Sequence, residues 1–172
     1  MTASKRTPGE FETLYHTINQ IIEEARNTVY HTANFTMVQA YWNIGRAIVK
    51  EEQNGKERAE YGQELIRQLA QKLSKKYGKS FSERNLWYIK QFYQKWGNMN
   101  ALRSELSWTH YRLLLRVEND QARQFYMQEA IDCNWSTRSL ERQIGNLYYD
   151  RLVMSNNAEA VKTEAVEKQK IQ

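Results

Sequence analysis

The chain has 172 residues, enough for one compact domain or for two small helical units that share a core. Its single cysteine, Cys133, excludes a disulfide within the chain, and its three scattered histidines give no metal-binding pattern. The formal net charge is +5. No segment is long and apolar enough to span a membrane, and the N-terminus lacks the apolar core of a signal peptide, so we expect a cytoplasmic protein. We also expect no cofactor.

Apolar residues recur every three or four positions through the first fifty residues, a spacing that predicts amphipathic helix. One stripe runs from Phe11 to Val29, and a second runs from Phe35 to Val49. Between them the stretch HTAN has no large apolar residue. The second stripe is either a new helix or a continuation of the first. We expect the two stripes to close on each other as a long N-terminal helical hairpin, and the alternative is that they pair between chains.

The middle of the chain predicts two further helices on either side of a short turn. The first carries apolar residues at Leu65, Ile66, Leu69, Leu73 and Tyr77. Gly78 then suits a left-handed C-terminal cap, and Ser82 is placed to cap the next helix. A helical projection of that second helix places one set of residues on its buried face: Leu86, Ile89, Phe92, Tyr93 and Trp96.

The C-terminal part predicts three short helices after an irregular segment around Gly97. Ser107, Asp120 and Ser136 are the expected N-caps. The last of these helices should bury Leu140, Ile144, Leu147 and Tyr148, and we interpret Cys133 as a packing residue. The whole pattern predicts an all-α fold of about seven helices, with a tail at 1–10, one helical domain at 11–153 and a polar helical tail or linker at 154–172.

Enzymatic signals are weak along the whole chain. Most carboxylates lie among the charges of helix surfaces, where solvent exposure explains them. The sequence has no glycine-rich phosphate loop, no nucleophile with a nearby base and no metal-ligand spacing. We therefore expect no catalysis by these residues.

Basic residues are concentrated between Arg67 and Lys95, where eight lysines and arginines face a single acidic residue, Glu83. Such a cluster is typical of a nucleic-acid binder, although a solvated lysine-rich helix explains the charge alone equally well. The order of helix, short turn and capped helix around Gly78 to Ser82 is that of a helix-turn-helix. The candidate contacts in this stretch are Lys75, Lys76, Lys79, Ser82, Arg84, Trp87, Lys90 and Gln91.

Trp87 falls in the middle of the polar arc of its helix. If the helix is only a scaffold, another helix should cover Trp87, and if the helix meets DNA, Trp87 should be exposed in a basic field.

A second candidate contact lies where two helices are joined through Cys133 to Ser136. The helix that follows begins with Thr137 and Arg138 and carries Arg142 one turn further on. The N-terminal residues of a helix can meet base edges or a phosphate. The alternative is structural, with Arg138 paired to Glu141 or Asp132 to hold the corner.

Several stretches together resemble the N-terminal domain of the YhcG-like family of bacterial proteins: YWNIGRAIV, YGQELIRQLAQKL, FSERNLWYIKQFY, LSWTHYRLLLRVEND, RQFYMQEAIDCNWSTRSLERQI and LYYDRL. They occur in order between about residues 11 and 153. The resemblance implies a helix-turn-helix or winged-helix type of DNA binding, placed before a C-terminal PD-(D/E)XK nuclease domain.

A shorter similarity, to the helix-turn-helix core of ParB-type partition proteins, covers LSWTHYRLLL and WSTRSLE and assigns motif places to Ser107, His110, Ser136, Arg138 and Glu141. This chain ends where the nuclease domain would begin, so cleavage is not expected from it. The predicted function is therefore non-catalytic binding of DNA, expected to be double-stranded, for a YhcG-like nuclease. The alternative is a helical oligomerisation module that positions a nuclease or another subunit, with a homodimer among the expected partners.

Overall fold

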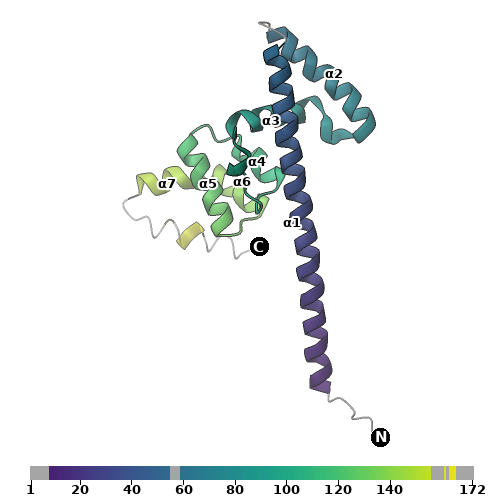
Figure 1. The fold of residues 1–172 in the computed structure, drawn as a ribbon. Helices are drawn as coiled ribbons and strands as arrows, with labels where there is room; N and C mark the ends of the chain where they lie inside the picture. The colour runs from purple at the N-terminus through teal and green to yellow at the C-terminus, as the bar shows by residue number, and fades with distance from the viewer. Residues whose placement is uncertain (1–7, 55–58, 156–160, 162, 166–172) are drawn as a thin grey trace.

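The computed structural model describes residues 8–54, 59–155, 161 and 163–165, and the part of the chain it describes is helical with no strand. Figure 1 shows one very long helix with the remaining helices gathered along one part of it. The elements in chain order are α1 (Pro8–Asn54), α2 (Ala59–Tyr77), η1 (Lys79–Phe81), α3 (Glu83–Lys95), η2 (Met99–Ala101), α4 (Trp108–Leu114), α5 (Asp120–Asp132), α6 (Thr137–Gly145) and α7 (Tyr148–Met154). The predicted all-α class is confirmed.

Helix α1 is one continuous helix of 47 residues, so the predicted hairpin between its two apolar stripes is wrong. The stretch between the stripes, HTAN, contains neither glycine nor proline, and the hydroxyl of Thr36 donates to the carbonyl of Thr32 within the helix at 2.8 Å. Nothing there interrupts the helical hydrogen bonds. At about 1.5 Å per residue the helix is about 70 Å long, and its N-terminal half extends away from the other helices in Figure 1.

The C-terminal half of α1 packs closely against α3. A Cβ atom added to Gly45 would lie 2.4 Å from the carbonyl oxygen of Ile89 and 2.8 Å from the Cβ of Tyr93, so only glycine fits this crossing. The indole N–H of Trp42 also donates to the carbonyl of Trp96 at the end of α3. This contact holds α3 against the middle of the long helix.

Two clusters of buried side chains form the core. One joins α1, α2 and α3 through Tyr41, Ile48, Ile66, Leu86 and Ile89. The larger cluster joins α1, α3 and the C-terminal helices, and its aromatic centre places the rings of Phe92 and Tyr111 4.8 Å apart. The predicted buried face of α3 is confirmed, because Leu86, Ile89, Phe92 and Trp96 are buried and Tyr93 is partly buried.

Most predicted caps are confirmed. Gly78 has φ 87° after the end of α2, and Ser82 accepts a hydrogen bond from the backbone N–H of Asn85. Ser136 caps α6 in the same way through the backbone N–H of Ser139 at 3.1 Å. The expectation for α5 was wrong by one residue: Asn119 is the N-cap and accepts from two backbone N–H groups, which leaves Asp120 as the first helical residue.

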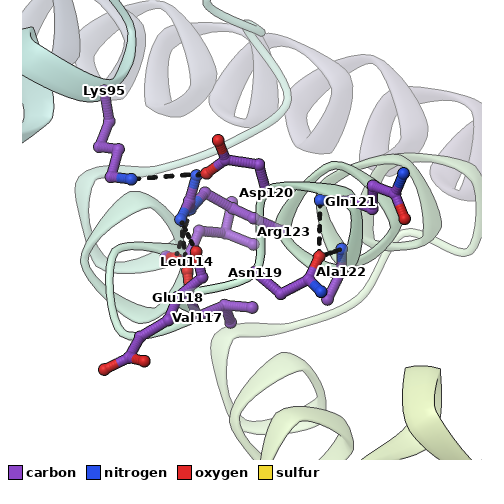
Figure 2. A network of polar contacts seen from close by, with 9 residues as sticks. All are labelled: Lys95, Leu114, Val117, Glu118, Asn119, Asp120, Gln121, Ala122 and Arg123. Carbon is purple, nitrogen blue, oxygen red and sulfur yellow. Dashed lines mark hydrogen bonds and ion pairs between the residues drawn. The ribbon is translucent and has the colours of Figure 1, made fainter.

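A buried arginine fixes the turn between α4 and α5 (Figure 2). Arg123 donates to the backbone carbonyls of Leu114 at 3.3 Å and Glu118 at 3.0 Å. It also contacts the carbonyl of Val117 and the carboxylate of Asp120, both at 2.5 Å. The hydrogen bond from Arg123, with the nearby charge of Lys95, lowers the pKa of the Asp120 carboxyl. Arg123 therefore ties the end of α4 and the turn after it to the first turn of α5.

Two expectations near the C-terminus were wrong. Leu147, predicted to be inward on the same helix as Leu140 and Tyr148, has φ 52° between α6 and α7 and is exposed. Cys133, predicted to pack, is exposed, and partial burial with the carboxylates of Glu129 and Asp132 raises the pKa of its thiol. Most of the predicted tail at 154–172 lies outside the described residues, but Ala165 is buried against the larger cluster and Glu164 pairs with Arg151.

Candidate nucleic-acid interface

Four basic side chains are exposed around the turn between α2 and α3. Lys75 and Lys76 lie in the last turn of α2, Lys79 begins η1, and Arg84 lies in the first turn of α3. The tight turn after Gly78 brings these elements together. We call these four residues the basic surface.

Hydrogen bonds fix the turn that carries the basic surface. The hydroxyl of Ser74 donates to the carbonyl of Phe81 at 3.0 Å, and the side-chain amide of Asn85 donates to the carbonyl of Ser80 at 2.6 Å. The rings of Tyr77 and Phe81 lie 5.7 Å apart across the turn. The relative positions of α2 and α3 are therefore set by the fold.

A cavity of about 210 Å³ adjoins the basic surface, and we call it the arginine pocket. Three cationic residues line it, Lys79, Arg84 and Arg112, and none of its lining residues is acidic. Its other lining residues are Tyr41, Ser80, Ser82, Asn85, Tyr88 and Trp108. The fold therefore gathers positive charge in a recess made by α1, η1, α3 and α4.

Tyr88 lies between the two arginines of the pocket. The guanidinium carbons of Arg112 and Arg84 lie 4.9 Å and 5.9 Å from the centre of its ring. A hydrogen bond from Arg84 lowers the pKa of the Tyr88 hydroxyl, and the charges of Arg84, Arg116 and Arg112 act in the same direction. The lowered pKa means that this corner of the protein favours a negative group.

Arg112 was not among the residues predicted from the sequence. It is 28 positions from Arg84, and only the packing of α4 beside α3 brings the two together. The indole N–H of Trp108 donates to the side-chain oxygen of Asn85 at 3.2 Å, which joins the start of α4 to the first turn of α3. The signal available in the sequence was a pair of arginines, Arg112 and Arg116, four residues apart at the end of α4 and just after it.

Lys90 belongs to a helix interface instead of the basic surface. Its amine lies 2.7 Å from the carboxylate of Glu52 on α1, and both side chains are mostly buried. The same amine lies 4.8 Å from the centre of the Trp87 ring. Trp87 is partly buried and packs against the core cluster of α1, α2 and α3. Trp87 is thus neither fully covered, as expected for a scaffold helix, nor fully exposed, as expected for contact with DNA. Gln91, another candidate contact on α3, is exposed.

The second predicted contact lies at a different cavity. Thr137, with Tyr30 and His31 of α1, lines a cavity of about 290 Å³ that does not include the arginine pocket residues. Arg138 is exposed, whereas the Nε and Nη2 atoms of Arg142 are buried and have no hydrogen-bond partner among the described residues. The two arginines do not form an exposed pair, and DNA contact by Thr137, Arg138 and Arg142 stays a prediction.

The residues that matched the partition-protein motif mostly have structural contacts. The backbone N–H of Ser107 donates to Nδ1 of His110 at 3.2 Å, and Nε2 of His110 contacts the carbonyl of Trp135 at 3.0 Å. Ser136 caps α6, and Glu141 pairs with Arg116 at 3.3 Å. The expected alternative of an Arg138–Glu141 pair is therefore replaced by an Arg116–Glu141 pair.

Two kinds of site have no support among the described residues. No group of three histidine, cysteine, aspartate or glutamate side chains there is placed to hold a metal ion. No described helix is long and apolar enough to cross a membrane.

The fold and the site define an all-helical domain with an exposed basic surface beside an arginine-lined recess. The profile of the family described as the DUF1016 N-terminal domain matches residues 17–151, and the chain therefore belongs to this family. A curated relative from Escherichia coli (strain K12), named "Putative nuclease YhcG", is 30% identical over 92% of this chain and 51% of its own length. The predicted resemblance to the YhcG-like family is confirmed.

The chain spans about half the length of that curated relative. No solved structure matches this chain.

Proposed function

We propose that this chain binds duplex DNA through the basic surface and is the non-catalytic, DNA-binding part of a YhcG-like nuclease. The observation that carries the proposal is the gathering of Lys75, Lys76, Lys79 and Arg84 on one exposed turn, next to a recess with no acidic lining residue. Phosphate contacts by lysine and arginine supply most of the affinity of such proteins. The name of the curated relative, a nuclease, agrees with a nucleic-acid partner.

The order of α2, turn and α3 supports a helix-turn-helix mode of docking. Arg84, Tyr88 and Gln91 are four and three residues apart, so they follow one face of α3. In this mode Arg84 and the lysines of the turn contact phosphates and set the position, while Gln91 faces base edges in the groove. The N-terminus of α3, capped by Ser82, adds a favourable dipole for a phosphate.

Two contacts within the structure change the set of residues that we propose for DNA binding. Lys90 is left out of the proposed interface because its charge is compensated by Glu52. Arg112 is added because it lines the recess beside Arg84. Five cations, Lys75, Lys76, Lys79, Arg84 and Arg112, then face DNA.

The test is fluorescence anisotropy of a labelled duplex over a series of salt concentrations. Five neutralised phosphates predict a slope of log affinity against log salt of about −5. The triple variant Lys75→Glu, Lys76→Glu and Lys79→Glu should lose binding. A matched triple variant at exposed cations elsewhere, Arg26→Glu, Lys50→Glu and Arg103→Glu, should keep most of it. A flat salt dependence, or equal losses in the two triple variants, would overturn the proposal.

A second candidate function is self-association through the N-terminal half of α1. A row of large apolar residues is exposed there: Phe11, Leu14, Tyr15, Ile18, Ile21, Ile22 and Val29. Such a contiguous apolar stripe is unusual on an unpartnered surface. The positions Phe11, Leu14, Ile18 and Ile21 alternate in steps of three and four, the spacing by which helices pair in coiled coils.

A further inference from the structure

We propose that the arginine pocket binds the terminal phosphate monoester of a DNA end. This inference rests on the proposed DNA binding and specifies which part of the DNA enters the pocket. The phosphates along the duplex would contact the exposed lysines outside.

The charge of the pocket fits a phosphate monoester. A terminal phosphate carries a charge of about −1.5 to −2 at neutral pH, whereas each internal phosphodiester carries −1. Arg84, Arg112 and Lys79 line the pocket, and arginine forms paired hydrogen bonds with phosphate oxygens. Glu83, also in the first turn of α3, is exposed and is not a lining residue. A dianion therefore gains more from this site than a diester does.

One of the arginines that line the pocket has a donor without a partner among the described residues. The Nε atom of Arg112 is buried and makes no hydrogen bond to any described residue. A buried donor without a partner carries a desolvation cost, so the fold holds Arg112 beside the pocket at some cost to stability. The guanidinium group is held in place by its stacking on Tyr88, so it is positioned before any ligand arrives.

The shape of the pocket favours an end over the middle of a strand. Its volume of about 210 Å³ is large enough to admit a phosphate group. The recess lies between α3 and α4, and the buried ring of Tyr41 and the partly buried ring of Trp108 contribute to its wall. A terminal phosphate can turn three oxygens toward the three cations, whereas a phosphate within a duplex has its strand continuing on both sides and presents only two.

The test compares blunt duplexes of one sequence that carry 5′-phosphate, 3′-phosphate or only hydroxyl ends, with the whole chain and anisotropy as the readout. One phosphorylated end should bind about tenfold more tightly than the hydroxyl end, the gain expected from charge-assisted hydrogen bonds. The 5′ and 3′ arms identify which end the pocket accepts. Arg112→Gln should reduce the ratio of the two affinities to about one, and the matched variant Arg26→Gln should leave the ratio unchanged.

Arg112 stacks on Tyr88, so Arg112→Gln is also expected to lower stability. A second variant, Arg84→Gln, changes an exposed residue and should likewise reduce the ratio of the affinities for phosphorylated and hydroxyl ends to about one. Equal affinity for phosphorylated and hydroxyl ends, with salt-dependent duplex binding intact, would overturn the end-binding proposal and leave the proposed function standing. No binding to any duplex would overturn both. A preference that survives both pocket variants would place the end-binding site elsewhere and overturn the assignment to this pocket.

Discussion

The amine of Lys90 lies 2.7 Å from the carboxylate of Glu52, and this ion pair joins α3 to the last turn of α1. The two side chains are only 15% and 17% exposed, so the pair is largely shielded from water. Removal of one partner leaves the other charge uncompensated in a poorly solvated position. Lys90 thus stabilises the packing of α3 on α1, and we leave it out of the proposed DNA interface.

Lys90→Met should lower the free energy of unfolding by about 2–4 kcal/mol, measured by urea denaturation. The matched variant is Lys95→Met on the same helix, whose partner Asp120 is exposed, and it should cost no more than about 1 kcal/mol. Equal costs would mean that the Lys90–Glu52 pair is effectively solvated. Lys90→Met should also leave the salt slope of DNA binding unchanged, whereas Lys79→Met should reduce it by about one.

Gly45 allows α1 and α3 to approach closely, and Gly45→Val should destabilise the protein by about 3 kcal/mol or more because its side chain would displace the backbone of Ile89. Gly9→Ala on the same helix is the control. The added methyl group there meets open space, so stability should be unchanged or slightly higher. Thermal unfolding followed by circular dichroism measures both effects. A neutral Gly45→Val variant would show that the helices do not cross at this glycine.

Local signals in the sequence predicted much of the fold, and long-range contacts account for most of what they missed. Gly78, Ser82 and Ser136 act within one turn of chain, so their roles follow from neighbouring residues. The hairpin failed because apolar spacing alone does not say whether a helix stops between two stripes. Arg123 satisfies carbonyls up to nine residues before it, a role that depends on how α4 and α5 turn.

The candidate site shows the same division. Lys75, Lys76, Lys79 and Arg84 are close in sequence and lie around one exposed turn, so a charge count found them. The count could not separate Lys90 from the others, because its partner Glu52 is 38 residues away. It also could not add Arg112, which reaches the pocket only through the packing of α3 and α4.

His110 should make stability depend on pH. Burial lowers the pKa of its imidazole, and a hydrogen bond to the carbonyl of Trp135 opposes this in part. The backbone N–H of Ser107 donates to Nδ1, which must therefore be unprotonated, and this assigns the proton to Nε2. The folded state thus binds a proton less readily than the unfolded state, whose histidine has a pKa of about 6.5.

The sign of the dependence follows from this difference. The stabilising contribution of neutral His110 is complete above about pH 6.5 and is lost as the pH falls below that value toward the lower pKa of the folded state. Urea denaturation at about pH 7.5 and about pH 5.5 should show a smaller pH effect in His110→Gln than in the wild type. His16→Gln, at an exposed position on α1, should keep the wild-type pH effect. An unchanged pH effect in His110→Gln would contradict the assignment.

The exposed stripe of α1 should make the protein self-associate. Sedimentation equilibrium of the wild type should give a mass near twice the 20.5 kDa of one chain, because pairing removes the stripe from water. Ile18→Glu with Ile21→Glu places charges in the stripe and should give the mass of one chain. Gln20→Glu with Asn27→Glu adds the same charges on the opposite face of the helix and should keep the larger mass. A wild type that sediments as a single chain at all concentrations would exclude pairing through α1, while DNA binding by the basic surface would remain open to its own test.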